Sequence, residues 1–218
     1  MSAHAPARTR APVRRPGKAQ RQRRRRILRR RLLVAGAVLL AVTIVVAVRP
    51  FADKAVQELK LPLRHEDIIR QQAAQKNLDP SLIAGVIYVE SRFRDQTSKA
   101  GAKGLMQLLP STADYIARKS GGTRFQQGDL ATPQINIAYG TWYLRYLLQH
   151  YHGNEVLAIA AYNAGEGKVD EWYRDAVSRG EDFDAATHIP FPETRDYVAR
   201  VLDARKRYRH EYRRELGI

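Results

Sequence analysis

From residue 65 to the C-terminus, apolar residues recur at intervals of three and four, the spacing that puts side chains on one face of an α-helix. No stretch of useful length shows the alternation of a β-strand. Helix boundaries are marked too, because Asp79 before Pro80 suits a helix start and Gly121 suits a helix end. This part of the chain is therefore expected to form one all-α or mainly α domain.

Seven segments combine helical periodicity with a start or stop signal. They are residues 65–77, 81–93, 105–119, 134–151, 156–163, 168–177 and 193–214. Within the third of them, Pro110 and Ser111 are expected to restart a helix after a turn, because proline favours the first helical position.

Residues 32–48 form an uncharged run of 17 residues, LLVAGAVLLAVTIVVAV. A helix of this length spans roughly 25 Å at 1.5 Å per residue, near the lower limit for a bilayer core of about 30 Å. Thirteen basic residues precede the run, and such an excess predicts a cytoplasmic N-terminus and an external C-terminal domain. We expect a single uncleaved transmembrane helix, followed by a linker over residues 49–64. A cleaved signal peptide is the alternative.

The net charge of +16 belongs mainly to the N-terminal tail. Residues 1–51 hold 14 of the 38 Lys and Arg and none of the 22 Asp and Glu, which leaves 24 basic and 22 acidic side chains elsewhere. A nearly neutral domain gives no electrostatic reason to expect a nucleic-acid partner. Residues 1–31, rich in Ala, Pro and Arg, are expected to be a disordered cytoplasmic tail that binds anionic lipid head groups.

Glu90 is an acidic residue in an otherwise apolar helical stripe, since Leu82, Val86 and Glu90 lie four residues apart. A carboxyl group on a buried helix face has a raised pKa, and it then keeps a proton available near neutral pH for general acid catalysis. Spacing alone leaves a second interpretation open, in which Glu90 pairs with Arg92 or Arg94 or lies in a frayed helix end.

Five motifs, in this order, resemble the soluble lytic transglycosylase (SLT) domain. They are VESRF, AGAKGLMQLLPSTA, NIAYGTWYLRYLL, AIAAYNAGEGKV and IPFPETRDYV. The resemblance covers roughly residues 65–205 and implies a mainly α, lysozyme-like fold of the goose-type/SLT class. Residues 65–218 would then be the catalytic domain.

The resemblance assigns roles to residues of the first two motifs. Glu90 matches the family's catalytic glutamate, and Ser91 matches the serine that follows it. Met106 and Gln107 match residues that line the sugar cleft. Without the resemblance, Met106 would be an ordinary core residue.

The later motifs supply the opposite wall of the implied cleft. Tyr162 and Asn163 match a pair of residues there, with the tyrosine close to the catalytic carboxyl. Glu90 is also a candidate partner for the Tyr162 hydroxyl, since a buried tyrosine needs one. Asn163 alone would be interpreted as a helix C-terminal residue. Glu193 matches an acidic position near the glycan or its stem peptide.

The implied reaction cleaves the β-1,4 bond between N-acetylmuramic acid (MurNAc) and N-acetylglucosamine (GlcNAc) in peptidoglycan. Glu90 would act first as acid and then as base, closing a 1,6-anhydro ring on the muramoyl sugar. A hydrolase with Asp95 as second carboxylate and a non-catalytic glycan-binding scaffold are the alternatives. The implied substrate indicates a bacterial protein. Together with the predicted span and its orientation, it predicts a single-pass protein of the inner membrane with a periplasmic catalytic domain.

No metal or other cofactor is expected. The chain has no cysteine, which excludes thiolate ligands and cysteine-based catalysis. His150 and His152 are two residues apart and would not share a helix face. The expected partners are peptidoglycan strands, from the resemblance, and the membrane, from the predicted span.

Overall fold

The computed structural model describes residues 58–122 and 124–218, together with residues 31, 33, 36, 39, 40 and 42–49. The chain divides into two compact units, Met1–Val56 and Gln57–Ile218. The predicted tail, apart from Arg31, lies outside the described residues, as do parts of the predicted span and linker.

In the first unit, the described residues between positions 31 and 49 are helical. Their large apolar side chains are exposed, namely Leu33, Leu39, Leu40, Val42, Ile44, Val45, Val46 and Val48. Among the residues described, no helix is both long enough and apolar enough to cross a membrane.

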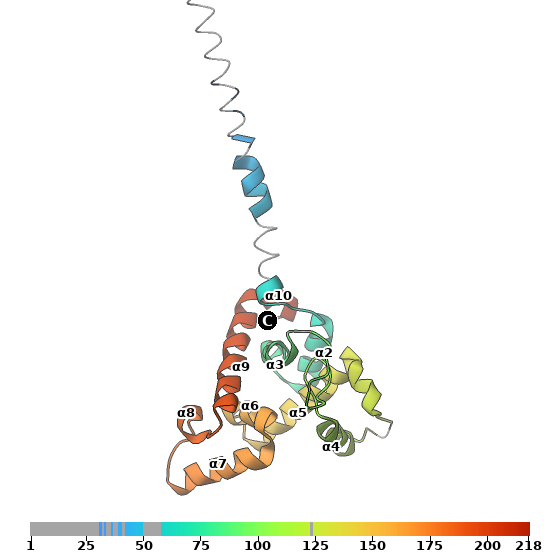
Figure 1. Ribbon diagram of the computed structural model, residues 1–218, viewed down its shortest axis with the longest axis vertical. Helices are drawn as coiled ribbons and strands as arrows, with labels where there is room; N and C mark the ends of the chain where they lie inside the picture. The colour runs from blue at the N-terminus through green and yellow to red at the C-terminus, as the bar shows by residue number, and fades with distance from the viewer. Residues whose placement is uncertain are drawn as a thin grey trace, which may run out of the picture. The chain divides into compact units, whose positions relative to one another are not determined.

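The second unit is built from helices, which Figure 1 shows in chain order. They are α2 (Glu66–Lys76), α3 (Pro80–Ser91), α4 (Pro110–Ser120), the 3-10 helix η1 (Gln127–Ala131), α5 (Pro133–His150), α6 (Glu155–Ala164), α7 (Glu166–Ser178), α8 (Ala185–His188), α9 (Pro192–Glu211) and α10 (Arg213–Leu216). Across residues 58–122 and 124–218 the β-structure amounts to two isolated bridges, Thr97 with Lys103 and Lys103 with Leu108. The prediction of a mainly α domain is confirmed.

Proline fixes the start of four helices, α3, α4, α5 and α9. In each case the preceding residue is extended, as the proline ring requires. At α3, the Asp79 side chain also accepts a 2.9 Å hydrogen bond from the Ser81 N–H. The predicted restart at Pro110 is confirmed, and residues 104–107 form a turn before it.

Helix α3 lies in the core and makes its most extensive contact with α9. The helices approach closely at Gly85, where an added Cβ would lie 3.0 Å from the Arg205 backbone nitrogen and 3.1 Å from the Val201 carbonyl oxygen. Helix α9 runs from the end of the unit that holds α7 and α8 to the end that holds α10 (Figure 1). A glycine at this crossing therefore sets where the C-terminal turn of α3 meets α9.

Two ion pairs hold the start of α3 to α9. Asp79 accepts from Arg205 at 3.0 Å and from Arg209 at 2.8 Å. Arg205 also pairs with Glu155 at the start of α6. Together with the contact at Gly85, these pairs fix α3 along its length.

We predict that Gly85→Ala lowers the free energy of unfolding by about 1–3 kcal/mol, because the methyl group has backbone atoms against it on α9. The matched control is Gly167→Ala, another helical glycine, whose added Cβ meets nothing within 4 Å. That substitution should raise stability by about 0.5–1 kcal/mol. Urea unfolding of the two variants measures the difference. Equal stabilities would show that the α3–α9 approach is not tight.

Candidate active site

Glu90 lies in the last turn of α3, with its side chain half-buried. Tyr197, on α9, donates a 2.6 Å hydrogen bond to Glu90 Oε1. Burial raises the pKa of Glu90 to about 7, while the Tyr197 hydrogen bond and the charge of Arg200 act in the opposite direction. Glu90 can therefore hold or release a proton near neutral pH.

Arg92 and Arg94, the two arginines considered as ion-pair partners of Glu90, hydrogen-bond to other groups. Arg92 donates to the Tyr88 hydroxyl at 3.4 Å, and Arg94 donates to the Ser91 carbonyl at 3.5 Å. Both arginines lie beyond the end of α3, where Arg92 and Phe93 adopt left-handed backbone angles with φ of 52° and 59°. This turn ends the helix just past Glu90.

The turn is held in place by Phe93, which is buried with its ring centroid 5.9 Å from that of Tyr208 on α9. The cost of two left-handed residues is thus offset by packing an aromatic ring. As a result, the Glu90 carboxyl is at the end of a helix and not along its middle.

Asn136, on α5, fixes the loop that follows. Its side chain is fully buried, accepts from the Met106 N–H at 2.8 Å, and donates to the carbonyls of Lys103 at 2.9 Å and Leu130 at 3.0 Å. Gly104 has φ of 76°, and a Cβ there would lie 2.1 Å from the Asn136 amide nitrogen. The loop bearing Met106 and Gln107 is thus anchored by one buried amide.

Two hollows open on Glu90. The first, about 330 Å³ and here named the polar hollow, is lined by Glu90 with polar, aromatic and aliphatic side chains. Those used below are Gln107, Tyr143, Tyr162, Asn163 and Glu193. The second, about 620 Å³ and here named the arginine hollow, is lined by Glu90, Ser91, Tyr88 and four arginines, Arg92, Arg94, Arg200 and Arg207, among others.

Four of the predicted substrate-binding residues meet Glu90 in the polar hollow. Gln107 has φ of 47° and its amide nitrogen donates to the carbonyls of Gln96 at 3.0 Å and Gly104 at 2.7 Å. Asn163 accepts a 2.8 Å hydrogen bond from the Thr194 hydroxyl. Tyr162 and Glu193 also line this hollow, so residues 103 apart in sequence come together around one carboxyl.

Two other predicted residues are placed differently. Ser91 is buried, and its hydroxyl donates to the Ile87 carbonyl at 3.1 Å, although the residue borders the arginine hollow. Met106 is fully buried, with its side chain against Gly140. The side chain of Met106 is therefore an ordinary core side chain, whereas its backbone carbonyl accepts a hydrogen bond from Tyr162 at the site.

The prediction that Glu90 is a hydrogen-bond partner of the Tyr162 hydroxyl was wrong. Its hydroxyl donates to the Met106 carbonyl at 3.0 Å, and the hydrogen bond to Glu90 comes from Tyr197. The physical reason is that α9, not α6, crosses α3 closely. Burial, and then the nearby charge of Glu90, raise the pKa of Tyr162 well above its ordinary value. Tyr162 therefore stays protonated beside the carboxyl.

Three residues at the site were not predicted from the sequence, namely Tyr143, Tyr197 and Arg200. Tyr143 lines the polar hollow with its ring centroid 5.6 Å from that of Tyr162. Tyr197 follows Glu193 by four residues in the same motif, so helical spacing already put the two on one face of a helix. That spacing was the available signal.

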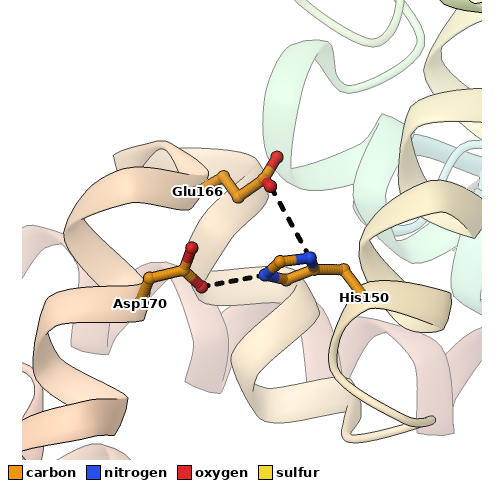
Figure 2. A group of neighbouring side chains, drawn as sticks. All are labelled: His150, Glu166 and Asp170. Carbon is orange, nitrogen blue, oxygen red and sulfur yellow. Dashed lines mark hydrogen bonds and ion pairs between the residues drawn. The ribbon is translucent and has the colours of Figure 1, made fainter.

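A separate cluster joins α5 to α7. Figure 2 shows His150 lying between two carboxylates, with Nε2 2.9 Å from Asp170 Oδ1 and Nδ1 3.6 Å from Glu166 Oε1. Potential metal-ligand atoms of the three residues lie within 4.8 Å of one another. Tyr146 donates to Glu166 at 2.9 Å and Tyr151 donates to Asp170 at 3.0 Å. These groups satisfy one another, and none of the three borders either hollow at Glu90.

Comparison with known proteins identifies the family. Residues 67–183 match the family model described as "Transglycosylase SLT domain". The chain belongs to the SLT transglycosylase family. The resemblance found in the sequence motifs is thereby confirmed.

Among curated SLT-domain relatives, the soluble lytic murein transglycosylase of Salmonella typhimurium is 35% identical over 155 residues, covering 70% of this chain and 24% of that protein. The membrane-bound lytic murein transglycosylase C of Actinobacillus pleuropneumoniae is 35% identical over 164 residues, covering 66% of this chain and 45% of the relative. The chain thus spans about a quarter of the length of the soluble relative.

A solved structure shows the same fold. The 70 kDa soluble lytic transglycosylase of Escherichia coli aligns with a TM-score of 0.65 and 34% identity, covering 70% of this chain and 25% of that one. The SLT fold of the second unit is therefore confirmed.

We predict that Tyr197→Phe raises the pKa of Glu90 above its value of about 7, because it removes a hydrogen bond that favours the ionised carboxylate. The measurement is a carbon-detected NMR titration of the labelled carboxyl. Tyr173→Phe, at an exposed tyrosine of α7, is the control and should leave the titration of Glu90 unchanged. An unchanged pKa in Tyr197→Phe would contradict the assigned role.

Proposed function

We propose that this protein is a peptidoglycan lytic transglycosylase, which cleaves the MurNAc–GlcNAc β-1,4 bond and forms 1,6-anhydro-MurNAc. Membership of the SLT family supports the reaction class. The observation that carries the proposal is Glu90, a half-buried carboxyl with a pKa of about 7, open to two hollows. A group with this pKa can donate a proton and later accept one at neutral pH.

In the first step, Glu90 donates its proton to the glycosidic oxygen, and the bond from this oxygen to C1 of the muramoyl sugar breaks. The departing GlcNAc keeps the proton as a hydroxyl group. The oxygen of the substrate's own N-acetyl group stabilises the positive charge that develops at C1. Tyr197 holds Oε1 by its 2.6 Å hydrogen bond, so Oε2 is the oxygen left to carry the proton.

In the second step, Glu90 is ionised and acts as a base. It removes the proton from the C6 hydroxyl of the muramoyl sugar while O6 bonds to C1, which closes the anhydro ring and restores the protonated acid. The Tyr197 hydrogen bond stabilises the carboxylate between the two steps. The polar hollow, with the Gln107 and Asn163 amides, offers neutral hydrogen-bonding groups to sugar hydroxyl and N-acetyl groups.

The hydrolase alternative needs a second carboxylate beside the scissile bond. Asp95, the residue considered for this role, is exposed and borders neither hollow. The position of Asp95 gives that alternative no support. Glu193 is the second carboxyl group that lines the polar hollow, and the family resemblance gives it a binding role. Ring closure by Glu90 alone is therefore the mechanism we put forward.

We also propose that residues 32–48 tether the protein to the bacterial inner membrane, with the N-terminus cytoplasmic and residues 65–218 in the periplasm. The exposed apolar side chains described in this segment and a membrane-bound relative support the proposal. Protease added to spheroplasts should remove the catalytic domain and leave an N-terminal epitope tag protected. Digestion of the tag in intact spheroplasts would contradict this orientation.

The reaction is tested by incubating the purified full-length chain with peptidoglycan and weighing the released fragments. We expect anhydro products, lighter by one water than hydrolytic ones. Glu90→Gln should lower the rate by about 10²- to 10⁴-fold, because glutamine cannot transfer the proton. Asp95→Asn is the matched control and should keep the wild-type rate and products.

Two results would contradict the proposal. Products with reducing-end muramic acid would overturn the ring-closing step. Glycan binding without release of fragments by the wild-type chain would favour the scaffold alternative.

A further inference from the structure

The cluster of His150, Glu166 and Asp170, here named the α5–α7 cluster, takes no part in the chemistry proposed for Glu90. His150 is the last residue of α5, and the two carboxylates are four residues apart in the first two turns of α7. That spacing puts both carboxylates on one face of α7. Figure 2 shows the imidazole lying between them. Two helices thus bring together three side chains of the kinds that bind transition-metal ions.

Negative charge exceeds positive charge in the α5–α7 cluster. Within the described ranges, no lysine or arginine forms an ion pair with Glu166 or Asp170, and the ion-pair partner of both is His150. An imidazole carries at most one positive charge, against two carboxylates. The three side chains are between 27% and 34% exposed. A divalent cation can therefore reach them from solvent, and its charge would balance both carboxylates.

Two tyrosines hold the three groups in place. Tyr146 donates a 2.9 Å hydrogen bond to Glu166 Oε1. Tyr151 donates a 3.0 Å hydrogen bond to Asp170 Oδ1. The rings of the same tyrosines pack on the imidazole of His150, with centroid distances of 6.3 Å for Tyr146 and 4.6 Å for Tyr151. Outer groups that hydrogen-bond to the ligands in this way orient them in metal sites and raise the affinity for the ion.

We propose that the α5–α7 cluster binds a zinc ion through one nitrogen of His150 and one oxygen each of Glu166 and Asp170. Candidate ligand atoms of the three residues lie within 4.8 Å of one another. Zinc bonds to nitrogen and oxygen are about 2.0–2.2 Å long, so the ligand atoms of one tetrahedral ion are about 3.4 Å apart. Rotation of these partly exposed side chains closes the difference. Calcium and magnesium prefer oxygen ligands alone, whereas an imidazole with carboxylates suits zinc.

The ion would replace the direct contacts between His150 and the carboxylates, and would join the end of α5 to the start of α7. A neutral imidazole offers one lone pair to the ion and keeps its proton on the other nitrogen. Since α7 begins at Glu166, three residues after Asn163, the ion would also fix the chain that leaves the polar hollow. The inference departs from the sequence-based expectation of no metal, because His150 is remote in sequence from the two carboxylates.

The test titrates zinc chloride into the purified full-length chain, after dialysis against a chelator, and measures binding by calorimetry and stability by thermal unfolding. We expect one ion per chain. Zinc at 100 times its Kd should raise Tm by about 5–10 °C, because the ion binds the folded chain and not the unfolded one. Magnesium or calcium chloride at the same concentration should leave Tm unchanged.

Two variants assign the ion to the cluster. His150→Gln and Asp170→Asn should each weaken zinc binding at least tenfold, because each removes one ligand. The matched control is His152→Gln, at an exposed histidine two residues along the chain, and it should keep the wild-type affinity.

Four results would overturn the inference. They are a wild-type Tm that zinc does not raise, wild-type affinity in either ligand variant, an equal loss of affinity in His152→Gln, and tighter binding of calcium than of zinc. None of these measurements uses peptidoglycan, so their outcome is independent of the proposed function.

Discussion

The close crossing of α3 and α9 is the contact on which the rest of the site depends. Without a side chain at Gly85, the two backbones come within van der Waals distance, and the last turn of α3 lies against Tyr197. The same crossing provides the tyrosine hydrogen bond, the charge of Arg200 and the burial that together set the pKa of Glu90. Helix packing here decides proton affinity as well as stability.

A carboxyl with a pKa of about 7 also affects folding. An unfolded glutamate has a pKa near 4.5, so between these pH values the folded chain keeps a proton that the unfolded chain has lost. Stability contributed by the protonated form is present below pH 4.5 and declines as the pH rises to 7. The full effect is roughly 3 kcal/mol. Burial that makes Glu90 useful as an acid thus costs stability once it ionises.

The helices and several site residues could be predicted from local sequence. Periodicity and prolines such as Pro110 mark the helix starts, whereas short elements such as α8 and η1 have too few residues to show a period. Local sequence could not show which of two neighbouring residues is buried in the core and which faces the hollow. Met106 is in the core and Gln107 faces the hollow, because Gln107 takes a left-handed conformation that breaks helical spacing. Tyr197 was missed because no local pattern reports which helices cross.

The family model covers residues 67–183 and stops before α9 begins at Pro192. Yet α9 supplies one wall of the arginine hollow, the hydrogen-bond partner of Glu90 and the surface that buries α3. A fragment cut at the edge of the matched region would keep the glutamate but lose its protein environment. The smallest fragment of this chain that keeps Glu90 in its folded surroundings must therefore include α9, well beyond the most recognisable motifs.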